Sequence, residues 1–182
     1  YSGMKNLSNI FLLNMPHLSQ DPIFGQSLIY LCEHNEDGAM GLIINKPLQK
    51  KHSIDIVSEI GLTNQQVYFG GPVSPDKGFI LHDINYKKDE TLVVSNTAGV
   101  SYSDEVLEDI KNGIGPINYR LVMGYSGWES GQLEEEVQNG DWMIIPSSKD
   151  IIFSKTHRNN WKIAINNLNI NFRDFTGQSG LA

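Results

Sequence analysis

The sequence predicts an α+β fold whose sheet is mainly antiparallel. Apolar runs of strand length outnumber amphipathic helical segments, and the early runs are joined by short turns rather than by helices. The 182 residues are 40% hydrophobic, which is enough apolar matter for a sizeable core, and no internal repeat divides them. We therefore expect one globular domain rather than a doubly wound parallel sheet.

The N-terminal part of the sequence predicts three strands. The first covers residues 7–15 and stops at Pro16, which has no amide donor. The second, residues 27–34, is apolar at nearly every position, which indicates burial on both faces. Asp37-Gly38 then predicts a tight hairpin turn, because glycine adopts positive φ at no steric cost, and residues 40–45 return as the third strand.

Two helices and three short strands are expected in the middle of the chain. Ser53 is a suitable cap for a helix over residues 53–59, which Gly61 ends. Ser103 likewise caps a helix over residues 103–111 with an apolar face. The three strands are expected at residues 67–69, 78–82 and 91–95.

The C-terminal part of the sequence predicts alternating strands and helices. A strand is expected at residues 119–125 and a helix at 132–138, where Leu133 and Val137 are four positions apart. A strand at residues 142–145 stops at Pro146. The last helix is expected at residues 160–168, with its apolar side formed by Trp161, Ala164, Ile165 and Leu168.

Composition and charge narrow the class of protein. Fourteen basic and twenty-one acidic residues give a net charge of −7, which argues against direct nucleic-acid binding because phosphate binding needs clustered Lys and Arg. The single cysteine, Cys32, has no second thiol for an internal disulfide. Without a secretory signal or an apolar run of membrane-spanning length, the sequence predicts a cytoplasmic protein with no membrane partner. Tyr1-Ser2-Gly3 before Met4 is interpreted as a cloning remnant, so the predicted domain covers residues 4–182.

One short motif is similar to the nucleophile elbow of hydrolases. Gly124-Tyr125-Ser126-Gly127-Trp128 falls between a predicted strand and a predicted helix, where an elbow presents its serine. The elbow pattern is G-x-S-x-G, but Trp128 stands in place of the second glycine, and its side chain would block the close approach of backbone and helix. We favour a plain strand-to-helix turn here, with a hydrolase that uses Ser126 as the alternative.

A second candidate is Cys32-Glu33-His34. On a regular strand Cys32 and His34 share a face, so both are placed to bind a metal ion together with a carboxylate. Cys32 continues an apolar run, however, where a free thiol acts as a small hydrophobic side chain, and its acidic neighbours disfavour a thiolate. We favour a core cysteine and a strand-end histidine, with a metal-dependent enzyme that uses His34 as the alternative.

Three further motifs have simpler structural interpretations. Consecutive helical positions diverge by about 100°, so Glu134-Glu135-Glu136 cannot converge on one ion, and we expect a solvated face that opposes the helix dipole. Gly70-Gly71-Pro72 lacks the rest of a phosphate-binding loop, which favours a tight turn over a ligand cradle. His82 and Asp83 are adjacent on a strand and therefore point to opposite faces.

The sequence resembles the YqgE/AlgH family of bacterial proteins over nearly everything from Leu7 onward, least well over residues 85–118. The resemblance implies a compact α+β fold whose bifurcated sheet curls into a pseudo-barrel, with peripheral helices. It implies no established reaction, and one branch is named for transcriptional regulation of alginate synthesis. Members often carry Ala where Ser126 stands, which further weakens the nucleophile. The matching blocks are Asn14-Met15-Pro16, residues 32–47, 67–73 and 78–82, Gly124 to Trp128, residues 131–136, Trp142, Trp161, Ala164, Leu168 and Gly180-Leu181-Ala182.

The leading functional hypothesis is a non-enzymatic binding or regulatory domain that acts on transcription, if at all, indirectly. No catalytic residue, cofactor or metal is predicted, the partner is a protein or small molecule, and the sequence does not fix the oligomeric state. We expect three segments to gather on one surface, namely His34 to Asn45, the Gly70-Gly71 turn and the connection from Tyr125 to Gln132, where Trp128 offers apolar area and a donor. The competing interpretation is that they only hold turns and core together. The predicted binding residues are His34, Asn35, Asn45, Gly70, Gly71, Tyr125, Trp128 and Gln132.

Overall fold

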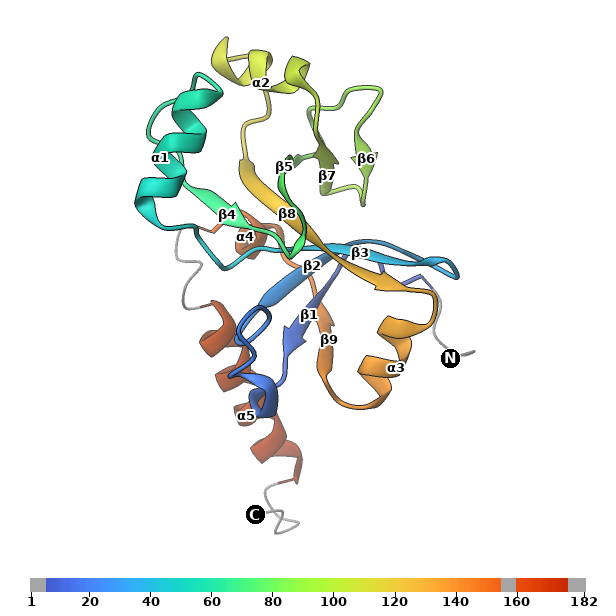
Figure 1. Ribbon diagram of the computed structural model, residues 1–182. Coiled ribbons are helices and arrows are strands. Elements are labelled where there is room, and N and C mark those ends of the chain that lie inside the picture. The colour runs from blue at the N-terminus through green and yellow to red at the C-terminus, as the bar shows by residue number, and fades with distance from the viewer. Residues whose placement is uncertain (1–5, 155–159, 177–182) are drawn as a thin grey trace.

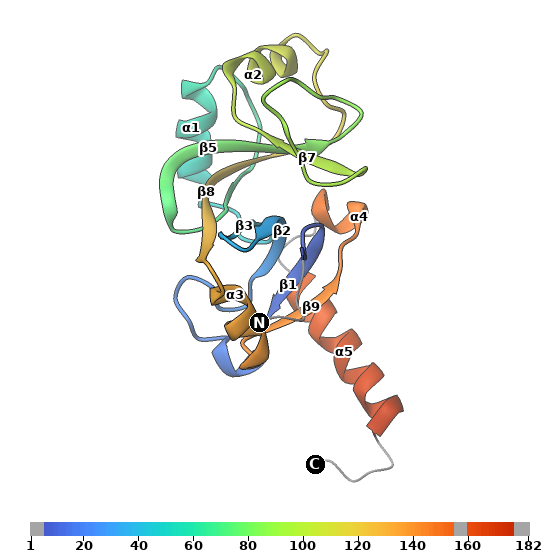
Figure 2. The same cartoon turned by 90° about the vertical axis from the view of Figure 1, so that its right-hand side faces the viewer.

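The computed structural model describes residues 6–154 and 160–176 of the chain. Within these residues, nine strands form one continuous sheet that curls into a half-barrel with helices around it, as Figures 1 and 2 show. This confirms the predicted α+β class and the curled, mainly antiparallel sheet. The proposed cloning remnant, residues 1–3, and the closing residues 180–182 lie outside the described residues.

The elements follow one another along the chain in a mixed order. The strands are β1 (Ile10–Asn14), β2 (Leu28–Asn35), β3 (Gly38–Ile43), β4 (Val67–Phe69), β5 (Val73–Asp83), β6 (Leu92–Val93), β7 (Ala98–Ser101), β8 (Tyr119–Glu129) and β9 (Trp142–Pro146). The helices are the 3-10 turn η1 (Pro16–Leu18), α1 (Lys50–Glu59), α2 (Asp104–Lys111), α3 (Gln132–Gln138), α4 (Lys149–Ile152) and α5 (Asn160–Thr176). Among the described helices, none is both long and apolar enough to cross a membrane.

Strand β8 joins the two halves of the sheet. The strands lie in the order β6-β7-β5-β8-β3-β2-β1-β9, and β4 pairs with β8 in parallel. Figure 1 shows β8 running from the upper lobe, where α1 and α2 lie, to the lower lobe, where α3 lies. Because both β4 and β5 pair with the first part of β8, they occupy its opposite edges.

Strand β2 is apolar because both of its faces are covered. Leu28 and Tyr30 belong to one buried cluster, whereas Ile29 and Leu31 belong to another on the opposite face. Residues Leu28 to Leu31 are at most 1% exposed. The predicted burial of this strand on both faces is confirmed.

A β-bulge at Cys32 changes the direction of the residues that follow it. The pairing of β2 with β3 runs Leu31↔Gly41 and then Glu33↔Met40, so Cys32 is the extra residue. Cys32 packs in the cluster that Met40 borders, while Ala39, the partner of His34, borders the opposite cluster. The expectation that Cys32 and His34 share a face is therefore wrong, because the bulge breaks the alternation.

Further expectations fail for local reasons. Ser53 does not cap α1, because the helix begins at Lys50 and holds Ser53 in its interior, where the hydroxyl accepts the Val67 amide. Ser126 lies inside β8, which continues to Glu129, so the predicted strand-to-helix turn at this residue is wrong. Gly124 and Gly127 gave the segment the composition of a turn, although the φ of 75° at Gly124 is an irregularity within the strand. The strand β7 was not predicted, because Ala, Gly and Ser have low strand propensity.

Candidate functional site

An open groove lies beside the last part of β8, and we call it the β8 groove. Its volume is about 1160 Å³. It is bordered by the β2–β3 hairpin, the start of β5, the end of β8 and the first residue of α3. The lining residues are Glu33, Asn35, Asp37, Gly38, Ala39, Met40, Val73, Lys77, Phe79, Tyr125, Gly127, Trp128, Glu129 and Gln132.

The groove has an aromatic floor and an acidic rim. The rings of Phe79 and Tyr125 meet edge to face with centroids 5.9 Å apart, and the Lys77 ammonium lies 5.3 Å from the Phe79 centroid. Glu33, Asp37 and Glu129 are exposed at the rim, and within the described chain none of these three carboxylates forms an ion pair. They give the rim an excess of negative charge over the single ammonium.

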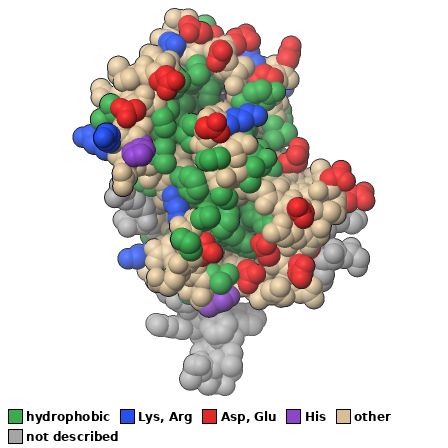
Figure 3. All heavy atoms as spheres, viewed as in Figure 1, with side chains coloured by type: hydrophobic (Ala, Val, Ile, Leu, Met, Phe, Trp, Pro, Cys, Tyr) green, Lys and Arg blue, Asp and Glu red, His purple; other side chains and the backbone are tan. Residues whose placement is uncertain are grey.

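On one face of the molecule, hydrophobic side chains lie together and acidic side chains surround them. Figure 3 shows hydrophobic side chains gathered in a band down the middle of the face seen in Figure 1, with Asp and Glu side chains around it.

One edge of β8 is open along the groove. Residues 126–129 pair with β3 on one side, and the described residues place no strand on the other, because the pairing with β5 reaches only Tyr125. The amide of Glu129 points to this open edge, since it donates to the Gln132 side chain at 2.9 Å. Backbone groups alternate between the two edges of a strand, so the N–H and C=O of Gly127 also point there.

Gly70 and Gly71 carry the chain across β8 from the edge that holds β4 to the edge that holds β5. A Cβ on Gly71 would lie 2.2 Å from the backbone of Tyr125, and one on Gly70 would lie 2.4 Å from the carbonyl oxygen of Gly124. The φ of Gly71 is also positive, at 151°. Both glycines therefore permit a close crossing of backbones, and neither lines the groove.

The Ser126 hydroxyl is part of this crossing. It is fully buried and donates to the carbonyl oxygen of Gly70 at 3.0 Å. Among the described residues, no histidine is hydrogen-bonded to it. A nucleophilic serine needs access and a base, so this geometry describes a structural hydroxyl.

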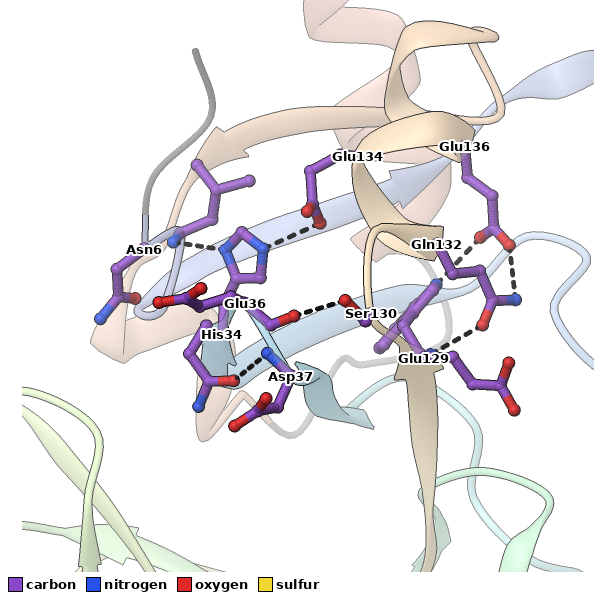
Figure 4. A network of polar contacts seen from close by, with 12 residues as sticks. Asn6, His34, Glu36, Asp37, Glu129, Ser130, Gln132, Glu134 and Glu136 are labelled. Atoms are coloured by element: carbon purple, nitrogen blue, oxygen red, sulfur yellow. Dashed lines mark hydrogen bonds and ion pairs between the residues drawn. The ribbon is translucent and has the colours of Figure 1, made fainter. Parts of the chain in front are cut away.

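His34 is buried against α3, away from the groove. Its Nδ1 accepts the backbone N–H of Leu7 and its Nε2 lies 2.9 Å from Glu134 Oε1, as Figure 4 shows. Since Nδ1 accepts, the ring proton is on Nε2 and is donated to the carboxylate. Both ring nitrogens are thus engaged within the fold, which leaves neither one available as a metal ligand in this conformation.

Glu134 is a buried carboxylate rather than part of a solvated helix face. Burial raises the pKa of Glu134, but the hydrogen bonds from His34 and from its own backbone amide outweigh this effect and leave the pKa below its usual 4.5. The expected solvated face is wrong for this residue, because the β2 bulge turns His34 toward α3. Glu135, the next residue, is exposed as expected.

Glu136 joins two tryptophans. Its Oε1 accepts the indole N–H groups of Trp128 and Trp142, each at 2.9 Å, and its Oε2 accepts from the Gln132 amide. The two indole rings also meet edge to face, with centroids 6.2 Å apart. The donor that Trp128 was expected to offer is therefore bound inside the protein, and the ring is only 7% exposed.

The remaining predicted residues have structural contacts. Asn45 is buried, accepts the N–H of Leu28 and donates to the carbonyl of Gln26. Burial raises the pKa of the Cys32 thiol, as expected of a core cysteine. His82, far from the groove, contacts the Asp83 backbone carbonyl and the Ser101 hydroxyl. Among the side chains that the structure describes, no three of His, Cys, Asp or Glu are grouped to suit a metal ion.

The structure brings together half of the predicted binding residues. Asn35, Tyr125, Trp128 and Gln132 line the groove, whereas His34, Asn45, Gly70 and Gly71 do not. The most important groove residues outside the three predicted segments are Lys77 and Phe79, and Gly127 lies within the predicted segment from Tyr125 to Gln132 although it was not named as a binding residue. Phe79 and Gly127 lie within the blocks of family resemblance, but nothing in the sequence indicated that β8 continues past Tyr125 and keeps an open edge.

Known proteins match this chain over nearly its whole length. The sequence profile described as AlgH-like matches residues 11–173. A UPF0301 protein of Cupriavidus pinatubonensis is 41% identical over 183 residues, which covers 97% of this chain and 96% of the relative. A UPF0301 protein of Pectobacterium carotovorum is 36% identical over 187 residues and is matched over 100% of its length.

Solved structures share the fold. The solution structure of the AlgH protein from Pseudomonas aeruginosa has a TM-score of 0.73 and 36% identity, covering 96% of this chain and 95% of that one. A crystal structure of a Corynebacterium diphtheriae protein at 20% identity has a TM-score of 0.70, covering 92% of this chain and 91% of that one, and shows the likeness of fold alone. The predicted family is confirmed by the profile, the relatives and the P. aeruginosa structure together: this chain is a member of the AlgH-like family.

Proposed function

We propose that this protein is a non-enzymatic binding domain that holds a protein partner in the β8 groove. The observation that carries the proposal is the combination of an aromatic floor, in which Tyr125 is half-buried and Phe79 is buried, with rim carboxylates that form no ion pair in the described chain. Tyr125, whose ring packs against the buried ring of Phe79, supplies apolar contact area, while Glu33 and Glu129 supply charge at the rim. Apolar anchors inside a polar rim are the usual composition of a protein-binding surface.

The contacts of the two candidate catalytic residues also support a binding function over an enzymatic one. Ser126 is buried in a hydrogen bond to a backbone carbonyl, and His34 has both ring nitrogens engaged. These contacts weigh against the hydrolase and the His34-dependent enzyme. The acidic rim would repel phosphate groups, so the proposal assigns any regulatory effect to contact with a protein rather than with DNA.

Affinity purification with a groove variant tests the proposal. Gly127→Leu fills the groove, because Gly127 is exposed and an added Cβ would meet only Tyr125 and Val73, at 3.5 and 3.8 Å. Asn112→Leu adds the same side chain at an exposed position outside the groove and serves as the control. We expect proteins bound by the wild type and by Asn112→Leu to be lost with Gly127→Leu.

Two readouts make this experiment decisive. Thermal unfolding followed by circular dichroism should show that both variants remain folded. Quantitative mass spectrometry of the bound proteins then compares the three samples. If folded Gly127→Leu keeps every partner of the wild type, the groove is not the binding site and the proposal is wrong.

A further inference from the structure

We propose that the occupant of the β8 groove is an extended, basic segment of a protein partner, which adds to the sheet as a strand along the open edge of β8. This inference rests on the proposed function and names the class of partner and the mode of binding. It is carried by the open strand edge at Gly127, together with the charge of the groove rim.

At Gly127, the backbone of β8 offers an N–H and a C=O group with which another strand can pair. The register with β3 turns the N–H and C=O of this residue to the edge that no described strand occupies. Gly127 is exposed, and its φ is not in the left-handed region, so the backbone there has an ordinary strand conformation. An incoming chain can therefore approach closely, because no side chain at this position stands in the way.

The groove limits the length and direction of the added strand. On one side, β5 already pairs with Tyr125 through Val73. On the other, the Gln132 side chain accepts the amide of Glu129 and so caps the edge. The open stretch is short, and affinity must therefore come from side chains in the groove as well as from backbone hydrogen bonds.

Charge selects the kind of segment that fits. Side chains of an added strand alternate between the two faces of the sheet, so every second residue of the segment would face the floor of Phe79 and Tyr125. Basic residues of the segment can reach Glu33, Asp37 and Glu129, none of which forms an ion pair in the described chain. Complementary charge of this kind raises the association rate and specificity and is weakened by salt.

Labelled heptapeptides test the inference with defined probes. The basic probe is Arg-Val-Lys-Leu-Arg-Val-Lys, and the acidic control replaces each Arg and Lys by Glu. A third peptide has the basic sequence with N-methyl groups on alternate amides, which keeps its charge but blocks strand pairing. Fluorescence anisotropy should show binding of the basic probe, at least about tenfold weaker binding of the N-methylated peptide, and no binding of the acidic one.

Matched variants locate the binding on the protein. Glu33→Gln/Glu129→Gln removes two rim charges, and Asp55→Asn/Glu59→Gln removes two exposed charges on α1, outside the groove. We expect the first pair to weaken the basic probe by about three- to tenfold and the second to leave it unchanged. Gly127→Leu should weaken it by at least about tenfold.

Each contrary result has its own meaning. Equal binding of the basic and the N-methylated peptides would overturn strand addition. The groove would still be a binding site in that case if Gly127→Leu lost partners in the affinity purification. Equal binding of the acidic peptide, or no binding of the basic one, would overturn the basic class of partner. The proposed function fails only if Gly127→Leu keeps all partners of the wild type, which is a separate measurement.

Discussion

The two halves of β8 differ in how completely they are enclosed. Residues 119–125 have β5 on one edge and β4 beside residues 121–123 on the other, whereas 126–129 pair only with β3 in the described structure. In the enclosed half, a glycine is required by close backbone contact, because a Cβ on Gly124 would lie 2.3 Å from the carbonyl oxygen of Gly71 in the crossing segment. In the open half, Gly127 has room beside it. The difference shows that a glycine-rich strand can combine a structural crossing with an accessible edge.

The acidic residues around the open half of β8 also fall into two groups, one with partners inside the protein and one without an ion pair. On the α3 side, Glu134 and Glu136 accept hydrogen bonds from His34 and from two tryptophans. On the groove side, Glu33 and Glu129 form no ion pair in the described chain. Carboxylates of the first kind stabilise the fold, and those of the second kind remain available to a partner.

The largest effect is expected from Gly71→Ala. The added Cβ would overlap the Tyr125 backbone at 2.2 Å, so the crossing strand must move. We expect a loss of about 3 kcal/mol or more in the free energy of unfolding. Gly127→Ala is the control, with a change of about 0.5 kcal/mol or less. Urea unfolding of both variants measures the difference, and similar stabilities would show that the two halves of β8 do not differ as described.

A smaller loss is expected from Glu136→Ala. The substitution leaves the indole N–H groups of Trp128 and Trp142 without their acceptor, at a cost of about 2 kcal/mol. Glu135→Ala, at the exposed neighbouring position, should change stability by about 0.5 kcal/mol or less. Denaturation followed by tryptophan fluorescence measures both variants. If the two substitutions change stability equally, the Glu136 carboxylate does not stabilise the fold through its hydrogen bonds to the two indoles.

The pH dependence of stability tests Glu134. Its pKa is lower in the folded protein than its usual 4.5, so the carboxylate stabilises the fold above that value and the contribution is lost as the pH falls through the folded pKa. Glu134→Gln cannot titrate and should cost roughly 1 kcal/mol at neutral pH. The difference between wild type and variant should shrink in acid. A difference that stays constant from neutral pH to acid would contradict the role of the ionised Glu134 carboxylate.

The smallest effect on stability is expected from the rim of the groove. Glu33 and Glu129 make no ion pair in the described structure, so Glu33→Gln/Glu129→Gln should change the free energy of unfolding by about 0.5 kcal/mol or less. Urea unfolding beside the wild type gives the value. A loss as large as that of Glu136→Ala would place these carboxylates in the fold rather than at a binding surface.

Local patterns predicted the fold well and the site only in part. Apolar runs, Asp37-Gly38 and the Ser103 cap, which accepts the Val106 amide, have direct physical signatures in sequence. The orientation of His34 depends on a β-bulge, in which two residues of β2 lie opposite one residue of β3. The role of Glu136 depends on two tryptophans that only the folded chain brings together. Alternation along a strand cannot reveal either feature. The open edge at Gly127 is an arrangement of whole strands and has no local signal.

Hydrogen exchange at the Gly127 amide tests the central claim most directly. This N–H points to the open edge of β8, so it should exchange quickly in the free protein. Saturation with the peptide Arg-Val-Lys-Leu-Arg-Val-Lys should slow its exchange at least about tenfold, because the amide then donates to the added strand. If the bound peptide leaves exchange at Gly127 unchanged, β8 does not accept a partner strand.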